Sequence, residues 1–329
     1  MNKSLNVPAE LDAALLNCKV YIVLLNYNGS ADTIECLESL QNLNYSNYQV
    51  LIIDNSQVDS PFITLLNWAI LKNIKFDQTT ESELDLEIFQ QQFVFVKAQQ
   101  NNGFAAGNNI ALMAILKVSG FDDYVWLLNN DTVVDKEALK NQISYVLKPE
   151  NKRIGILGSK LIYYFDQDKI QAIGGKFNEN FYITTHVGEG ESIKKNKEEF
   201  QEIDYVVGAS MLVSRQFLKE VGTLNEDFFL YYEELDWANR AKKQNWTLDW
   251  CEDSIVFHKE GASIGSSYKS TQKSFFSEIN IFKSRKIFIK KYYKPGLRFY
   301  VASLLLILNR VRKGKLKLGL ALLKITFEK

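Results

Sequence analysis

The chain has 329 residues, of which 46% are hydrophobic and 24% are charged, a composition typical of a globular protein with a sizeable core. Its 39 basic and 39 acidic side chains give a formal net charge of +0, which argues against a general nucleic-acid binder. The length suits one large α/β domain with an appendage, or two domains. Cys18, Cys36 and Cys251 are scattered without metal-binding spacing, which suits a reducing cytosol.

Strand and helix patterns alternate through the first half of the chain. Continuous apolar runs predict strands over residues 19–25, 48–53, 93–96 and 124–128. Helical spacing or composition predicts helices over residues 33–43, 64–72, 105–117 and 136–147. This alternation predicts right-handed crossovers and a mostly parallel central sheet flanked by helices.

Polar clusters follow three of these strands, at residues 26–28, 54–56 and 129–131. The carboxyl ends of parallel strands share one edge of a sheet, so the clusters are predicted to converge there, as at a nucleotide site. Taken alone, Asp131 or Thr132 also fits the cap of the helix that follows. The repetition at three strand ends favours a binding site.

A glycine-containing loop at residues 101–109 lies between a predicted strand and a predicted helix. Its glycines permit close backbone approach, and N–H groups at the helix start can face an anion or a base. The loop matches neither the P-loop nor the dinucleotide fingerprint. An ordinary connecting loop remains the alternative.

The second half is less regular, with short strands predicted over residues 154–161 and 170–175 and a strand-like run over 206–213. Small residues interrupt that run and permit close approach of a ligand or another backbone. Downstream, Glu233, Asp236 and Arg240 follow the i, i+3, i+7 spacing of one helical face. These acids fit either an internal ion pair or a general base near a sugar hydroxyl.

The C-terminal segment is strongly basic, with fourteen Lys or Arg residues and one acid, Glu328, between residues 281 and 329. The apolar run at 299–308 is too short to span a bilayer. The segment fits either an anionic membrane surface or packing on the protein's own core. Residues 1–17 lack the long apolar stretch of a secretory signal, so a cytoplasmic location is expected, peripheral on the inner face of the cell membrane if the basic segment binds lipid.

Together these segments make the chain resemble the family 2 glycosyltransferases with a GT-A fold, in particular the rhamnosyltransferase-like branch. The matching pieces, in the family's order, are residues 24–29, 54–56, 102–109, 128–132, 205–212, 222–236 and 258–263. The resemblance covers residues 20–291. It implies an N-terminal extension (1–18), a GT-A domain (19–268) and a basic amphipathic helical segment (269–329).

The resemblance implies inverting transfer of a sugar from a nucleotide diphosphate donor, dTDP-rhamnose or a UDP-hexose, to an acceptor hydroxyl. The acceptor would be a growing cell-surface saccharide or a lipid-linked glycan. Asp131 matches the last acid of the family's Asp-x-Asp motif, and His258 completes the implied Mg²⁺ or Mn²⁺ site. Asn129 departs from the motif, because many members carry Asp there.

Glu234 matches the family's general base, although it is Glu rather than Asp, and Asp236 is a neighbouring acid that helps position the helix and the acceptor. The residues implied to bind the donor are Leu25, Asn26, Tyr27, Asn28, Asp54, Asn55, Asn102, Gly103, Asn108, Asn129 and Asn130. Those implied on the acceptor side are Gly208, Ala209, Ser210 and Glu233.

Two other functions stay open. A nucleotidyltransferase of the same fold usually needs a basic loop for the triphosphate, and residues 26–29 contain no Lys or Arg. A catalytically decayed nucleotide-sugar-binding or scaffold protein would be compatible with the departures at Asn129 and Glu234.

Overall fold

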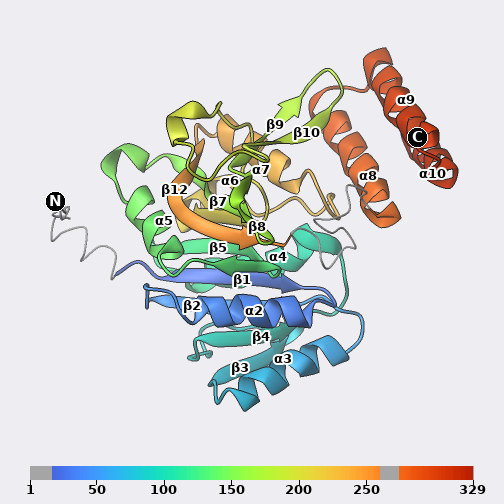
Figure 1. Cartoon of the computed structure of the whole chain (residues 1–329). Helices are drawn as coiled ribbons and strands as arrows, with labels where there is room; N and C mark the ends of the chain where they lie inside the picture. The colour runs from blue at the N-terminus through green and yellow to red at the C-terminus, as the bar shows by residue number, and fades with distance from the viewer. Residues whose placement is uncertain (1–16, 260–273, 329) are drawn as a thin grey trace.

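A computed structural model describes residues 17–259 and 274–328 of the chain. Within them, twelve strands form one large and one small sheet (Figure 1). The strands are β1 (Val20–Asn26), β2 (Tyr48–Asp54), β3 (Phe76–Thr80), β4 (Phe93–Lys97), β5 (Tyr124–Asn129), β6 (Thr132–Val134), β7 (Ile154–Tyr163), β8 (Asp166–Ala172), β9 (Gly174–Asn178), β10 (Ile183–Val187), β11 (Ser210–Ser214) and β12 (Thr247–His258).

Helices cover both faces of the large sheet, and three more follow it at the C-terminus (Figure 1). They are α2 (Ser30–Leu40), α3 (Ser60–Leu71), α4 (Gly103–Val118), α5 (Ala138–Val146), α6 (Arg215–Val221), α7 (Glu233–Lys243), α8 (Phe275–Tyr292), α9 (Leu297–Arg312) and α10 (Leu316–Phe327). Short 3₁₀ turns lie at Glu81–Glu83, Pro149–Asn151 and Lys197–Glu199. The strands and helices predicted in the first half are present, with their ends moved by a few residues.

The large sheet has the order β3-β4-β2-β1-β5-β11-β7-β12-β6, with β8 paired to β7. Its first five strands are mutually parallel, whereas β11 runs antiparallel to both β5 and β7. In β1, Ile22 belongs to the buried cluster that includes residues of α2, α3 and α5. Its neighbour Val23 belongs to the cluster on the other face, with residues of α4, α6 and α7. Burial of both faces explains why these strands are continuous apolar runs.

Two predicted strands in the second half have different boundaries. The run over 206–213 forms a strand only from Ser210, because Tyr205 bridges to Gly175 of the small sheet and the chain then crosses to the large one. The strand predicted over 170–175 is two strands. It breaks at Ile173, next to Gly174, whose φ of +157° and closeness to Ile203 leave no room for a side chain.

The C-terminal helices begin against the sheet-containing part of the chain and then extend away from it (Figure 1). Phe288 of α8 packs with Tyr232 and Leu235 in one buried cluster. Helices α9 and α10 form a hairpin that packs on α8 through Phe282. None of the described helices is long and apolar enough to span a bilayer. Residues 1–16 of the predicted N-terminal extension (1–18) and the predicted boundary at 268 lie outside the described residues.

Candidate active site

The polar clusters predicted at three strand ends meet at one edge of the sheet. In the parallel register, Asn26 of β1 is the partner of Asp54 in β2, and Leu25 is the partner of Asn129 in β5. The predicted convergence is therefore a property of the fold, and it joins segments that lie 28 and about 100 residues apart in the chain.

Asp54 is the centre of the first cluster. Its carboxylate is fully buried and accepts hydrogen bonds from Asn26 Nδ2 at 2.7 Å, Ser56 Oγ at 2.7 Å and Lys97 Nζ at 2.8 Å. Because these donors belong to the ends of β1 and β4 and to the residues after β2, Asp54 joins the ends of these three strands. Lys97 had no predicted role, although it ends a fourth parallel strand at the same edge.

Asn26 fixes the loop between β1 and α2. Its Oδ1 accepts from Thr33 Oγ1 at 2.9 Å and from the Gly29 N–H at 3.2 Å, and Asn130 Nδ2 donates to the same Thr33 hydroxyl at 2.9 Å. Of the loop residues predicted to bind the donor, Asn28 is exposed and Leu25 and Tyr27 are partly exposed, whereas Asn26 and Asn130 are buried. Leu25, Tyr27 and Asn28 are therefore the residues of this loop that a ligand can contact.

The loop before α4 is tied to the first cluster and to the segment before α7. Asn55 Nδ2 donates to Asn101 Oδ1 at 3.0 Å and to the Gly103 carbonyl at 3.2 Å, while the buried Asn55 Oδ1 has no partner among the described residues. Asn108 donates back to Phe104 within its own helix. Asn102 lines a cavity of about 310 Å³ that runs along α4.

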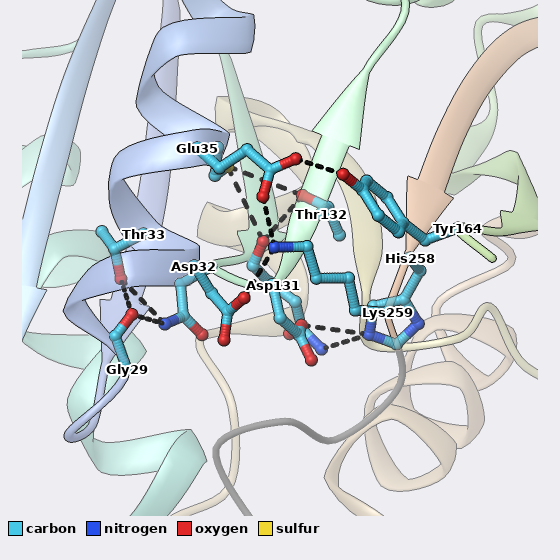
Figure 2. Close-up of polar contacts among 12 residues, drawn as sticks. Gly29, Asp32, Thr33, Glu35, Asp131, Thr132, Tyr164, His258 and Lys259 are labelled. Carbon is cyan, nitrogen blue, oxygen red and sulfur yellow. Dashed lines mark hydrogen bonds and ion pairs between the residues drawn. The ribbon is translucent and has the colours of Figure 1, made fainter. Parts of the chain in front are cut away.

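Asp131 and His258 form the second cluster, shown in Figure 2. His258 Nε2 lies 3.1 Å from Asp131 Oδ1 and 3.5 Å from Asn129 Nδ2, and both Asp131 and His258 are more than nine-tenths buried. The antiparallel pairing of β12 with β6 brings them together, because His258 is the register partner of Thr132. A carboxylate and an imidazole are ligands that suit Mn²⁺, and the carboxylate suits Mg²⁺.

The protein supplies a small ligand set at this point. No group of three or more His, Cys, Asp or Glu side chains close enough to hold a metal ion is found in residues 17–259 and 274–328. Asp131 and His258 fit a divalent cation whose remaining ligands come from a bound diphosphate and water. Asn129 adds a neutral amide beside them, and among the described residues Asp131 is the carboxylate that His258 Nε2 contacts.

Lys259 joins the end of β12 to α2 across this site, as Figure 2 shows. Its N–H donates to the Asp131 carbonyl at 3.0 Å, and its Nζ bonds Asp32 Oδ1 at 2.6 Å and Glu35 Oε2 at 2.5 Å. Tyr164 Oη donates to the same Glu35 carboxylate at 2.5 Å. Burial alone would raise the pKa of Glu35, but the bonds from Lys259 and Tyr164 lower it below its usual value.

Sequence reasoning did not include this ion-pair group in the site. The signal available was the position of Lys259 directly after His258 and the two acids in the first turns of α2. Their partners are more than 220 residues away in the chain, which no local pattern shows.

The acids of α7 differ in their surroundings. Asp236 is fully buried, and its oxygens bond Arg240 Nε at 2.8 Å, Lys291 Nζ at 2.6 Å and Tyr292 Oη at 2.8 Å. Glu233 is also buried, and its Oε2 has no partner in the described chain. Burial and the neighbouring Glu234 raise the pKa of Glu233 well above its usual value. Glu234 is the acid of the three that stays partly exposed.

A strained segment leads into these acids. Tyr231 and Tyr232 have φ values of 70° and 71°, a left-handed conformation that is unfavourable for large side chains. Two such residues in succession mark a segment held by its surroundings, of the kind that concentrates at functional sites. Here Tyr232 Oη donates to the Tyr182 carbonyl at 2.9 Å, inside the aromatic cluster with α8.

The residues predicted on the acceptor side lie where the chain enters β11. Ser210 is buried, and its Oγ accepts from Trp126 Nε1 at 2.9 Å and lies 2.8 Å from Ser159 Oγ. Ala209 is buried as well, and its carbonyl accepts from the Asn129 N–H at 3.0 Å. This segment is therefore attached through its backbone to the strand end that carries Asp131.

Comparison with known proteins identifies the family. A model of the family described as glycosyl transferase family 2 matches residues 21–222, and the chain belongs to this family. A curated relative, the low-salt glycan biosynthesis hexosyltransferase Agl10 of Haloferax volcanii, is 22% identical over 192 residues. The match covers 58% of this chain and 60% of Agl10, so the chain spans less than two thirds of that relative.

A solved glycosyltransferase structure shares the fold at low identity. The mannosyltransferase PcManGT from Pyrobaculum calidifontis, in complex with GDP-Man and Mn²⁺, has a TM-score of 0.53 and 12% identity, over 95% of this chain and 79% of that one. TarS 1–349 of S. aureus has a TM-score of 0.46 and 13% identity, over 93% of this chain and 90% of that one. The predicted family and GT-A fold are confirmed, whereas the roles of individual site residues stay predictions.

Proposed function

We propose that this protein transfers a sugar from a nucleotide diphosphate donor to a hydroxyl group of a saccharide acceptor, with inversion at the anomeric carbon. Family membership supports glycosyl transfer and argues against nucleotidyl transfer. The observation that carries the proposal is the sheet edge where the Asn26–Asp54 pair is linked through Asn130 and Thr33 to the segment of Asp131 and His258.

Asp131 and His258 hold Mn²⁺ or Mg²⁺ in this proposal. A divalent cation there supplies positive charge that offsets the negative charge on the departing diphosphate. The accessible Leu25, Tyr27 and Asn28 contact the nucleoside, because they lie on either side of Asn26, whose side chain donates to Asp54 at 2.7 Å.

Glu234 is the general base. It is the partly exposed acid of the first turn of α7, at a helix N-terminus where the macrodipole favours the ionised form. Glu234 takes the proton of the acceptor hydroxyl as that oxygen bonds the anomeric carbon. On the opposite face the bond to the diphosphate oxygen breaks, and its electron pair leaves with the nucleoside diphosphate. The buried Asp236 acts through its ion pairs and positions α7.

The donor and the acceptor are proposed by class. dTDP-rhamnose and UDP-hexoses are the donors that the sequence resemblance favours. The hexosyltransferase relative and the GDP-Man-bound structure add GDP-mannose to the candidates. The acceptor is a growing cell-surface saccharide or a lipid-linked glycan.

Release of nucleoside diphosphate from a panel of these donors, with Mn²⁺ present, tests the function. Glu234→Gln is expected to lower turnover by roughly 10²–10⁴-fold while donor binding is retained. Asp131→Ala is expected to remove Mn²⁺-dependent donor binding. Wild-type turnover in Glu234→Gln would overturn the assignment of the base. Donor binding without turnover on any acceptor would instead favour a nucleotide-sugar-binding scaffold.

The acceptor is reached at the cytoplasmic membrane face through the hairpin of α9 and α10. Each helix packs one apolar side inward and exposes a second one. The exposed large apolar residues are Leu297, Val301, Leu304, Leu305 and Leu308 in α9, and Leu316, Leu320, Leu323 and Phe327 in α10. Their three- and four-residue spacing places them along one side of each helix.

Charge supports an anionic lipid surface as the proposed occupant of these apolar sides. Residues 297–327 contain no acid, and Arg298, Arg312, Lys313, Lys317 and Lys324 are exposed beside the apolar residues. Each basic residue near an anionic bilayer contributes about 1 kcal/mol of attraction. An apolar stripe flanked by cations is the pattern of a helix that lies in the membrane interface.

A further inference from the structure

Gln171 contacts His258 on the side away from Asp131. It belongs to β8, is 1% exposed, and its Oε1 lies 2.7 Å from His258 Nδ1. Its Nε2 is buried and has no partner in the described chain. Among the described residues, the contact with His258 is therefore the hydrogen bond that the Gln171 side-chain amide makes.

The contact determines which nitrogen of His258 carries hydrogen. An amide oxygen only accepts, so His258 must donate from Nδ1. The neutral imidazole then has its lone pair on Nε2, the atom that lies 3.1 Å from Asp131 Oδ1. A lone pair and a carboxylate oxygen are both acceptors. They attract each other only when a metal cation, or a second proton on the imidazole, lies between them.

The opposite orientation of the amide would have the opposite effect. If Gln171 Nε2 donated to His258 Nδ1, the imidazole would carry its hydrogen on Nε2 and donate it to Asp131. That arrangement would satisfy the Asp131–His258 pair internally and remove the nitrogen ligand. The orientation of one buried amide thus decides whether this pair can hold a metal ion.

We propose that Gln171 is a positioning residue that keeps His258 in the Nδ1–H tautomer, with Nε2 presented toward Asp131 as a ligand for a divalent cation. The inference rests on the metal site of the proposed function. It adds the residue that lets His258 bind the cation through Nε2. Outer partners of this kind orient metal-binding imidazoles in other proteins. A neutral amide, unlike a carboxylate, adds no negative charge next to the Asp131 carboxylate and the Asn129 amide.

Three variants separate positioning from a general structural effect. Gln171→Met keeps the length of the side chain and removes the acceptor. Gln171→Glu keeps an acceptor and adds charge. Gln142→Met is the matched control, because Gln142 is a fully buried glutamine whose amide donates to Ser159 Oγ at 2.7 Å, away from His258.

Two readouts are independent of turnover. The first is Mn²⁺ affinity, measured by electron paramagnetic resonance of free Mn²⁺ without donor. Gln171→Met is expected to bind Mn²⁺ roughly 10–100-fold more weakly, Gln171→Glu at least as tightly as wild type, and Gln142→Met with wild-type affinity. The second is the tautomer of His258 from ¹⁵N imidazole NMR, which is simple to assign because the chain has two histidines.

Wild-type protein is expected to show the Nδ1–H form, and Gln171→Met is expected to lose it. An Nε2–H form in wild type, or wild-type Mn²⁺ affinity in Gln171→Met, would overturn the inference. The two proposals fail differently. If wild type binds no Mn²⁺ but shows the Nδ1–H form that Gln171→Met loses, the proposed metal site is wrong and the control of the tautomer by Gln171 is supported.

Discussion

The carbonyl oxygen of Phe229 occupies the space where Gly103 would carry a side chain. It accepts the Phe104 N–H at 2.7 Å and would lie 2.2 Å from a β-carbon on Gly103. Through this contact the segment before α7 rests on the first turn of α4. Asn109 adds a second link, because it donates to the Leu224 carbonyl at 2.9 Å.

Gly103→Ala is therefore expected to destabilise the protein and lower its activity. The φ of +95° at this position costs an L-residue about 1–2 kcal/mol, and the overlap with Phe229 adds to that cost. Thermal unfolding and nucleoside diphosphate release measure the two effects. Gly296→Ala is the control, since that glycine has an ordinary φ of −109° and open space around it. Equal melting temperatures for both variants would contradict the prediction.

Lys97→Met is expected to weaken both stability and donor binding. It removes the cation that faces the fully buried carboxylate of Asp54. Loss of one partner from a buried pair costs about 3–5 kcal/mol, and the lower end applies because the Lys97 side chain is 20% exposed. Denaturant unfolding and the donor KM are the measurements. Lys72→Met, which breaks an exposed pair with Glu38, should cost less than about 1 kcal/mol.

Glu233→Gln is expected to stabilise the protein at neutral and alkaline pH. Because burial and Glu234 raise the pKa of Glu233, the folded protein retains a proton that the unfolded chain releases above the usual pKa. The free energy of unfolding of wild type therefore falls as pH rises from about 4.5 through the raised pKa. The free energy of unfolding of the variant does not fall in this way. Each kcal/mol by which it exceeds that of wild type raises the melting temperature by about 2 °C.

Melting temperatures at pH 5, 6, 7 and 8 test this pH dependence. The difference between Glu233→Gln and wild type should grow with pH and vanish near pH 4.5. Glu87→Gln, at an exposed position, is the control and should show no such trend. A difference that is constant over the whole range would show that ionisation of Glu233 is not its cause.

Leu305→Glu combined with Leu320→Glu is expected to abolish binding to anionic vesicles. The change places a charge on the exposed apolar side of each hairpin helix while their buried sides stay intact. Co-sedimentation with phosphatidylglycerol vesicles measures binding, which should also weaken as salt rises. Leu71→Glu combined with Ile88→Glu, at exposed apolar positions elsewhere, should bind as wild type does. Unchanged sedimentation of the variant would contradict the prediction, and a wild-type dimer that the hairpin variant separates would identify a second copy as the occupant instead.

The sheet edge was predictable because local patterns determine it. Apolar runs such as 48–53 give the strands, and parallel pairing then brings their polar ends together. Strand β3 had no such signal, since Phe76–Thr80 is largely polar and lies at the edge of the sheet. The basic C-terminal segment was left with two alternatives, own core or membrane surface. Helices α9 and α10 have one apolar side that packs on the protein and a second apolar side that is exposed.

Contacts between distant segments were beyond sequence reasoning. Gln171 contacts His258 because β8 and β12 both pair with β7. The apolar pattern of a strand does not predict which other strands it will pair with. The i, i+4 bond from Arg240 to Asp236 was foreseeable from helical spacing, whereas Lys291 and Tyr292 reach the same carboxylate from 55 and 56 residues away.

The bonds from Lys291 and Tyr292 to Asp236 limit where the chain can be shortened for expression or crystallisation. A fragment that stops before Lys291 would leave the buried Asp236 carboxylate with Arg240 as its remaining ion-pair partner, and would remove Tyr292, Tyr293 and Phe299 from the aromatic cluster around Phe288. Such a fragment should accumulate as insoluble protein. A stop placed between α8 and α9, after Tyr293, keeps the bonds to Asp236 and removes the exposed apolar sides of the hairpin. It also removes Phe299 from the aromatic cluster and the Ser303 hydroxyl that Arg285 bonds at 2.7 Å.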